Sequence, residues 1–344
     1  MVSFERSVLR HAIETQVSDI YLTEGQNIQM RKDGVLIPCL DDIPTREFMQ
    51  MVLKRMLSEE RRQSFAKKLD IDFSWTFEGR RFRVNAYCQR GCPAIAMRLL
   101  PDRIPLLEEI QHNRAIFDLL QCEHGLILVC GKVGSGKTTT VASFLNALNH
   151  QRPVHILTLE DPVEYVFQPD KAFISQRELG RDVLSFALGL RSALREMPDV
   201  LLLGEIRDAD SMRTALMAAE SGMLVIGTLH TLRAAEAVMR MEGFFPVNER
   251  DAIRTQIASV LQAVFSQQLI PAKTGGRVCL SEVLLGNDTA ASLIRQGKYG
   301  QISTLMITHR RSGMMTKNAA LDELFRKRLI TSEVRMRFYE EEQM

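Results

Sequence analysis

The sequence predicts an α/β protein in which a mostly parallel sheet follows a small α+β domain. At 344 residues the chain is longer than one average domain. Before about residue 100, alternating segments joined by turns favour antiparallel hairpins. From about residue 106, apolar strands alternate with helical patterns, which is typical of a parallel sheet covered by helices on both faces. We therefore expect a first domain at residues 1–100, a linker at 101–106 and a second domain at 107–344.

The first domain should contain two helices and several short strands. Apolar residues at helical spacing predict helices over residues 3–16 and 45–66, and Thr45 is a candidate N-cap. Strands and hairpins are predicted at residues 20–22, 27–40, 72–87 and 94–100, with turns at Asp33-Gly34 and Glu78-Gly79. Pro101 and Pro105 favour an irregular connection to the next domain.

The second domain should be organised around a central parallel sheet. Its predicted strands are residues 126–130, 155–159, 200–203 and 224–228. Open sheets of this kind bind ligands at the carboxyl ends of their strands, so the chemistry should lie just after each strand. The C-terminal segment, residues 319–342, has an apolar face at helical spacing and should form one or two helices that pack on this domain; docking of a partner is the alternative.

A phosphate-binding loop follows the first of these strands. Residues 131–138 match Gly-x-x-x-x-Gly-Lys-Thr and lead into a helix from Lys137 to about His150. In such a loop the backbone N–H groups surround phosphate oxygens, lysine contacts the β- and γ-phosphates, and the threonine hydroxyl ligates Mg²⁺. The alternative, a Gly-rich turn that happens to contain Lys-Thr, fits the flanking strand and helix poorly. The candidate nucleotide-binding residues are Gly131, Gly134, Ser135, Gly136, Lys137, Thr138 and Thr139.

Carboxylates follow the second and third strands. Residues 160–164 read Glu-Asp-Pro-Val-Glu. An acidic loop alone is usually just solvated, but the position of this one directly after a strand favours a role in holding Mg²⁺ or orienting a water. Glu205 ends the third strand in a Walker B arrangement, where an acid reaches Mg²⁺, often through water, or positions the attacking water. The position before it is Gly204 instead of the usual Asp, so it offers no direct metal ligand.

His230 and two arginines are further candidates. His230 follows the fourth strand and should face the same crevice, where it could contact the γ-phosphate; a structural histidine is the alternative. A helix over residues 182–196 would carry Arg191 and Arg195 on one face. These could contact phosphate or a neighbouring subunit as an arginine finger does, or they could form a solvated basic face.

Composition excludes several other classes of protein. The formal net charge of +2 gives no case for nucleic acid or for an anionic membrane surface. No apolar run approaches 18 residues and the first residues do not resemble a secretory signal, so we expect neither membrane insertion nor export. Six scattered cysteines without a Cys-x-x-Cys pair indicate reduced thiols in a cytoplasmic protein.

Four stretches together resemble the motifs of a known family. Residues 131–140, 156–164, 190–208 and 227–231 resemble the Walker A, Asp box, Walker B and His box of the secretion and pilus ATPases, and more closely those of PilT-type retraction ATPases of type IV pili. The resemblance extends over nearly the whole chain. It implies a PAS-like first domain, a RecA-like P-loop ATPase domain and a hexameric ring. It also implies an ATP-driven motor, cytoplasmic and peripheral at the inner-membrane pilus base, that turns a platform protein to retract pili.

The resemblance also implies roles for individual residues, with ATP and Mg²⁺ as cofactors. Glu164 matches the Asp-box glutamate that activates water, Glu205 the Walker B glutamate, and His230 the His-box histidine. Arg83 and Arg98 match arginines of the first domain that approach nucleotide at a subunit interface. Arg195 lies in the matching Leu-Arg-Glu segment.

Three departures from the family pattern concern coupling of hydrolysis to movement. Met223 replaces a second histidine, Gln268 stands where arginine is common, and a retraction-linked motif is reduced to residues 293–295. Since none of them alters Lys137 or Glu205, hydrolysis should survive. A pilus assembly or type II secretion ATPase is the alternative motor. A nucleic-acid motor is disfavoured by the near-neutral charge, and a regulator that only binds ATP would lack turnover.

Overall fold

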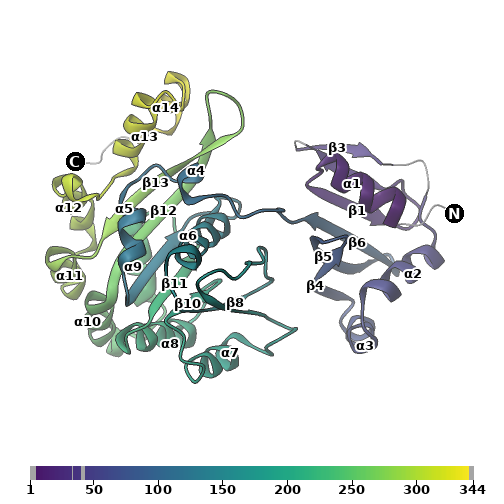
Figure 1. The fold of residues 1–344 in the computed structure, drawn as a ribbon, viewed down its shortest axis with the longest axis horizontal. Helices are drawn as coiled ribbons and strands as arrows, with labels where there is room; N and C mark the ends of the chain where they lie inside the picture. The colour runs from purple at the N-terminus through teal and green to yellow at the C-terminus, as the bar shows by residue number, and fades with distance from the viewer. Residues whose placement is uncertain (1–4, 33, 40–42, 341–344) are drawn as a thin grey trace. The chain divides into compact units, whose positions relative to one another are not determined.

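The computed structural model describes residues 5–32, 34–39 and 43–340, which form two compact units. The first unit contains the described residues up to Arg103 together with Pro162–Val166, and the second unit contains the remainder. The short segment Pro162–Val166 was expected in the second domain, but its contacts group it with the first. Figure 1 shows the course of the chain through both units.

The first unit is a six-stranded antiparallel sheet with helices, in the strand order β3-β2-β1-β6-β5-β4. Its elements are the π-helix η1 (Glu5–Leu9), α1 (Arg10–Thr15), β1 (Asp19–Thr23), β2 (Gln29–Lys32), β3 (Val35–Pro38), α2 (Arg46–Met56), α3 (Glu59–Lys68), β4 (Asp70–Phe77), β5 (Arg80–Gln89) and β6 (Cys92–Leu99). The predicted hairpins are present. Asp33 and Leu40, which belong to the first of them, lie outside the described residues.

The prediction of a single helix at residues 45–66 is wrong, because the chain forms two helices there, α2 and α3. Thr45 caps α2 as expected, since its hydroxyl accepts a hydrogen bond from Phe48 N at 3.2 Å. Leu57 then turns extended and is buried, which ends α2. Ser58 starts α3 because its hydroxyl accepts from Arg61 N at 3.4 Å. A serine cap inside a helical pattern therefore marked the break.

The second unit contains a seven-stranded sheet in the order β13-β12-β7-β11-β10-β8-β9, parallel except for β13. Its elements are α4 (Leu107–Ile110), α5 (Ala115–Asp118), η2 (Leu119–Gln121), β7 (Gly125–Cys130), α6 (Lys137–Gln151), β8 (His155–Glu160), β9 (Phe173–Glu178), α7 (Phe186–Ala193), β10 (Val200–Leu203), α8 (Ala209–Glu220), β11 (Leu224–Leu229), α9 (Ala234–Gly243), η3 (Val247–Glu249), α10 (Arg250–Val260), β12 (Leu261–Pro271), β13 (Arg277–Leu285), α11 (Asp288–Arg295), η4 (Tyr299–Gln301), α12 (Ile302–Thr308), η5 (Arg310–Ser312), α13 (Lys317–Arg326) and α14 (Ser332–Phe338).

The expected α/β fold is thus confirmed, and the four predicted strands correspond to β7, β8, β10 and β11. Strands β9, β12 and β13 were not predicted. Strand β9 lies at a sheet edge and contains several polar residues, so it lacks the apolar run that marks a central strand. Strand β12 begins at Leu261, immediately after α10. No turn residue separates them, so the sequence does not mark where the helical spacing of apolar residues changes to the alternation of a strand.

Helices cover both faces of this sheet. The alternating residues Leu126, Leu128 and Cys130 of β7 belong to one buried cluster with residues of helices α7 to α12. Ile127 and Val129 alternate with them and therefore point to the opposite face, where α6 follows the same strand. Both faces of β7 are buried, which explains why its sequence is a continuous apolar run.

The helix predicted at residues 182–196 is shorter than expected. Ser185 caps it by accepting a hydrogen bond from Leu188 N at 3.3 Å, so α7 begins at Phe186. It ends at Ala193, and the next residues form tightened turns, with Arg195 N bonded to Ser192 O at 2.9 Å. Pro198 disfavours helical backbone in the residue before it, which contributes to this early end. Arg195 consequently lies beyond the helix, and the argument that it shares a helix face with Arg191 is wrong.

The C-terminal segment forms two helices, α13 and α14, near the turn of the β12–β13 hairpin (Figure 1). Leu321, Leu324 and Ile330 pack with Ile270 and Leu280 in one buried cluster. The segment therefore packs on its own unit, as expected; residues 341 and 342 of the predicted segment lie outside the described part. None of the helices in the described ranges is long and apolar enough to cross a membrane.

Candidate active site

The loop from Gly131 to Thr138, called the P-loop below, joins β7 to α6. Gly131, Gly134 and Gly136 have φ values of 144°, 77° and 87°, which side-chain-bearing residues rarely adopt. A Cβ atom on Gly131 would lie 2.3 Å from the carbonyl oxygen of Gln267 and 2.5 Å from Ser135 Oγ. The first glycine is therefore required both by its backbone angle and by the close approach of β12.

Lys137 begins α6, and its ammonium group folds back over the P-loop. Its Nζ donates hydrogen bonds to Gly131 O at 2.7 Å and to Lys132 O at 3.0 Å. Thr138 and Thr139 follow in the first turn of α6 and are half-buried. The free N–H groups of a helix N-terminus attract anions, and a lysine held at this point adds a full positive charge. This arrangement suits the phosphates of a nucleotide.

Gln267 supports the P-loop from the neighbouring strand β12. Its Nε2 donates a hydrogen bond to Ser135 O at 2.9 Å, and its side chain is buried. Ser135 Oγ is also buried, and it has no hydrogen-bond partner within the described part of the chain. A buried hydroxyl without a partner costs free energy unless a ligand or water completes it, so this atom is consistent with a phosphate-binding loop.

Glu205 lies at the carboxyl end of β10, between a histidine and an arginine. Its Oε1 lies 3.1 Å from His230 Nε2, which follows β11, and its Oε2 accepts a hydrogen bond from Arg207 Nη2 at 2.8 Å. Arg207 Nη1 also lies 3.9 Å from Asp161 Oδ2, just after β8. The structure therefore brings together the predicted acid and the predicted histidine from two adjacent parallel strands.

Opposing effects set the charge of Glu205. Burial disfavours its ionised form and by itself raises the pKa of this carboxyl group. The hydrogen bond and charge of Arg207, with a smaller contribution from His230, outweigh burial and bring the pKa of Glu205 below its usual value. The group is consequently a carboxylate at neutral pH, able to accept a proton or a hydrogen bond from water.

Gly204 and Met223 replace an acid and a histidine of the family pattern, and the structure shows where each of them lies. A Cβ on Gly204 would lie 3.0 Å from Leu159 O and 3.3 Å from Glu160 Cα, so β8 leaves little room for a larger residue there. Met223 precedes β11, whereas His230 follows it. At about 3.3 Å per residue the two lie about 20 Å apart, at opposite ends of the strand. The missing second histidine is therefore remote from Glu205.

The acidic residues at the end of β8 and just after it have different surroundings. Glu160 is buried, and its Oε1 accepts hydrogen bonds from Thr158 Oγ1 at 2.7 Å and from Gln176 Nε2 at 3.3 Å. Asp161 faces Arg207, as described above. Glu164 is half-buried and belongs to the first unit, while the P-loop belongs to the second. Its activation of water therefore stays a prediction.

Arg83 and Arg98 lie side by side on neighbouring strands of the first unit. They are directly paired residues of β5 and β6 in the antiparallel register. Arg98 Nε also contacts Asp19 Oδ1 at 2.8 Å, from the other neighbouring strand. Arg195, in the second unit, is exposed beyond the end of α7. The approach of these three arginines to a nucleotide stays a prediction.

Any Mg²⁺ at this site would be held mainly by the phosphates of a bound nucleotide and by water, with few ligands from the protein. Across residues 5–32, 34–39 and 43–340, no cluster of three or more His, Cys, Asp or Glu side chains could hold a metal ion. Mg²⁺ in nucleotide sites characteristically uses only one or two protein oxygens, with phosphates and water completing its shell. The hydroxyl of Thr138 in the loop–helix junction and the carboxylate of Glu205 are oxygen donors of that kind.

Sequence reasoning missed Gln267, Arg207 and Gln111 at this site. Gln111 is buried and donates from Nε2 to Thr140 Oγ1 on α6 at 2.9 Å, while its Oε1 accepts from Ser281 Oγ at 3.1 Å. A signal existed for two of them. Gln267 lies in a polar Ser-Gln-Gln stretch between the apolar residues of β12, and Arg207 lies two positions after Glu205. Nothing local indicates that Gln111 lies beneath α6.

The geometry can be compared with known proteins. The family model described as type II/IV secretion system protein matches residues 2–337. The chain is 41% identical over 300 residues to the twitching motility protein of Neisseria gonorrhoeae, covering 87% of this chain and 80% of that one. It is 38% identical over 329 residues to the type IV pilus retractation ATPase PilT of Pseudomonas aeruginosa, covering 95% of each. The crystal structure of the pilus retraction motor PilT with bound ADP matches with a TM-score of 0.90 and 39% identity, over 98% of this chain and 97% of that one.

Proposed function

The chain belongs to the type II/IV secretion system protein family, and from this premise we propose that it hydrolyses ATP to retract type IV pili. One observation carries the proposal. A P-loop and an ionised glutamate paired with a histidine share one sheet edge, in a chain 38% identical over 95% of its length to a protein named as a retraction ATPase. The geometry fits a site for phosphoryl transfer from ATP, and the similarity to a protein named as a retraction ATPase indicates the kind of motor that we propose.

Within the second unit, each group has a distinct task in the proposed reaction. The P-loop N–H groups and Lys137 bind the phosphates, and the lysine exchanges its two loop carbonyl partners for phosphate oxygens. Glu205 orients the attacking water, and His230 and Arg207 hold its two oxygens in place. Thr138 and, through water, Glu205 would hold Mg²⁺, which would supply positive charge against the negative charge of the phosphates.

The remaining predicted residues would complete the site. Glu164 would activate the water, while Arg83, Arg98 and Arg195 would approach the nucleotide across a boundary between subunits. The assembly would be a homo-hexamer at the cytoplasmic face of the inner membrane, turning a platform protein of the pilus. The irregular segment near Pro101–Pro105 contains the boundary between the two units, after Arg103, and would act as the pivot.

The departures from the family pattern should leave hydrolysis intact. Gln268 alternates with Gln267 on β12 and so faces away from it. Ile294 is buried in the main core, whereas Arg295 is exposed in the last turn of α11. Since none of these side chains forms part of the P-loop or the Glu205 pair, we expect them to affect how hydrolysis is coupled to movement.

The biochemical test is phosphate release from ATP by the purified full chain. Lys137→Ala should abolish it, because the loop loses the charge that contacts the β- and γ-phosphates. Lys67→Ala, at an exposed lysine near the end of α3, is the matched control and should behave as the native chain. Equal turnover in Lys137→Ala and the native chain would contradict an ATPase at this site.

The direction of work is tested in cells that carry Glu205→Ala in place of the native chain. Pilus number and twitching are then measured. Cells with excess pili and no twitching would support retraction, because pili would assemble but not be withdrawn. Cells without pili would instead support an assembly ATPase of the same family.

A further inference from the structure

The loop at residues 230–233 connects the Glu205 partner to the rest of the second unit. His230 lies at its start, 3.1 Å from Glu205, and Arg233 lies at its end, just before α9. Two contacts fix Leu232 between them. Its carbonyl accepts from Ser266 Oγ at 2.6 Å, and its N–H donates to Glu236 Oε2 at 3.3 Å. In so short a loop, whatever holds Arg233 also restricts where His230 can lie.

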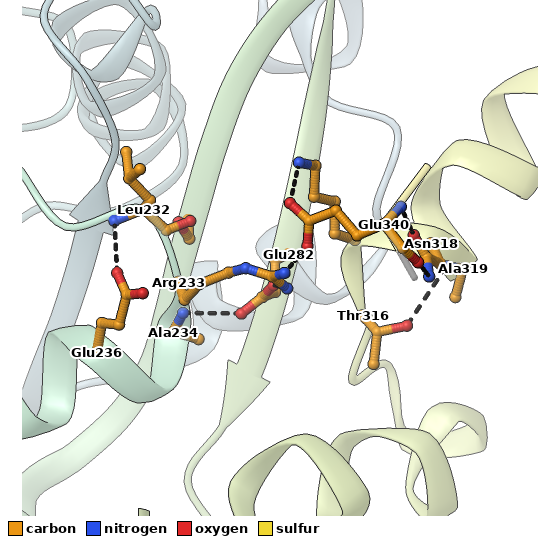
Figure 2. Close-up of polar contacts among 11 residues, drawn as sticks. Leu232, Arg233, Ala234, Glu236, Glu282, Thr316, Asn318, Ala319 and Glu340 are labelled. Carbon is orange, nitrogen blue, oxygen red and sulfur yellow. Dashed lines mark hydrogen bonds and ion pairs between the residues drawn. The ribbon is translucent and has the colours of Figure 1, made fainter. Parts of the chain in front are cut away.

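Two carboxylates from distant parts of the chain hold Arg233 (Figure 2). Glu282 on β13 lies 3.2 Å from Arg233 Nη1 and also accepts a hydrogen bond from Ala234 N at 2.8 Å. Glu340, which follows α14, forms an ion pair with Arg233 Nη2. Glu282 is only 7% exposed, so its contacts are shielded from water.

Glu340 is itself fixed at the start of α13. Asn318 Nδ2 donates to Glu340 O at 2.8 Å, and Glu340 N donates to Asn318 Oδ1 at 3.1 Å, as Figure 2 shows. Lys317 Nζ forms an ion pair with the Glu340 carboxylate. The backbone of Glu340 is thus fastened to α13, while its side chain reaches the loop after β11.

The strand register places this cluster beside the P-loop. Cys130, the last residue of β7, pairs with Ser266 on β12, and Ser266 pairs with Glu282 on β13. Two strand spacings of about 4.8 Å separate Cys130 from Glu282, or about 10 Å. Burial lowers the pKa of Lys317, and the positive charges of Arg233 and of the P-loop residue Lys132 lower it further.

We propose that Glu340 is a positioning residue, which acts through Arg233 to fix the loop that carries His230. The C-terminal segment would thereby set the rate of hydrolysis at a site it does not touch. This inference rests on the proposed function, because it requires ATP turnover at Glu205. A partner that drew Glu340 away from Arg233 would slow the motor without contacting the nucleotide.

The test measures kcat and KM for ATP with the full chain. Glu340→Gln keeps the size of the side chain but loses its charge, so the loop is held less firmly. We expect kcat to fall by between about 2-fold and about 30-fold, the range for residues that act through others, with KM nearly unchanged. Glu340→Asp should recover part of the loss. Glu333→Gln, at an exposed glutamate on α14, is the matched control and should leave kcat unchanged.

A double-mutant comparison separates positioning from general stabilisation. If Glu340 acts through His230, then adding Glu340→Gln to His230→Ala should lower kcat no further. A further loss equal to that in the native background would overturn the inference. Should Glu340→Gln melt below the assay temperature, Arg233→Lys replaces it, because lysine keeps the charge but cannot contact both carboxylates in the same way.

The outcomes for the two proposals are distinguishable. A native chain that releases no more phosphate than Lys137→Ala refutes the proposed function. A native chain that does hydrolyse ATP, with Glu340→Gln at the same kcat, refutes only the role of Glu340.

Discussion

Replacing Gln267 by Leu should weaken nucleotide binding while leaving the fold intact. Gln267 Nε2 donates to Ser135 O in the middle of the P-loop at 2.9 Å, and the side chain is 3% exposed. Leucine has nearly the same volume, so β12 should keep its packing. The substitution therefore removes one buried hydrogen bond that holds the P-loop in shape, and little else.

The size of the effect on nucleotide binding follows from the polar group that the substitution leaves without a partner. A buried carbonyl that loses its donor costs about 1 to 3 kcal/mol. Leucine also removes Gln267 Oε1, which is buried and has no hydrogen-bond partner in the described chain, and this offsets part of the cost. Without its donor the free P-loop should relax so that Ser135 O reaches water, and nucleotide binding must then restore the bound shape. A net cost of about 1 to 2 kcal/mol for that step corresponds to binding that is weaker by about 5-fold to 30-fold.

The assay is a fluorescence titration of the purified chain with a labelled nucleotide, together with thermal melting. Gln268→Leu is the matched control, because the neighbouring side chain on β12 points to the opposite face. We expect the control to bind within about 2-fold of the native chain. The reasoning is refuted if Gln267→Leu binds as tightly as Gln268→Leu while both melt at the native temperature.

Three further substitutions have outcomes fixed by the geometry. Gly131→Ala should abolish nucleotide binding in the same titration, because the new Cβ would lie 2.3 Å from a backbone carbonyl of β12; binding near the native affinity would contradict this. Arg207→Gln removes the main influence that opposes burial at Glu205, so the pKa of Glu205 should rise and the acid limb of the ATPase pH profile should move to higher pH; an unmoved limb would show that Glu205 does not control it. Arg254→Leu removes the cation whose Nη2 lies 2.7 Å from Glu242, a side chain that is 5% exposed, and leaves it with the hydroxyl of Tyr299 and the more distant charge of Arg250. This should cost about 3 to 5 kcal/mol in chemical unfolding, and a loss below 1 kcal/mol would exclude a buried charge there.

Much of the second unit could be predicted because its signals are local. The apolar run before Gly131, the glycine spacing and Lys137 together predicted a strand, a loop and a helix, and the structure confirms β7, the P-loop and α6. Each of these features depends on neighbours in sequence. A positive φ needs glycine at that residue, and a helix needs a good start within one turn.

Element ends were predicted less well where polar side chains compete with periodicity. Ser58 and Ser185 each start a helix by accepting a backbone hydrogen bond, and neither was recognised from the pattern of apolar residues. The early end of α7 at Ala193, before Pro198, was missed as well, and it leaves Arg195 past the end of the helix. A cap contributes only about 1 kcal/mol, yet that is enough to decide where a marginal helix begins.

The sequence by itself determined the phosphate-binding loop, the α/β class of the second unit and the acid and histidine at its strand ends. Only the tertiary structure placed His230 against Glu205, Gln267 beneath the P-loop, Glu340 on Arg233 and Met223 at the remote end of β11. The physical reason is the range of the interactions. Loop and helix geometry is set by residues a few positions apart, whereas strand order and register bring together residues as distant in sequence as Ser135 and Gln267, and no local pattern encodes that pairing.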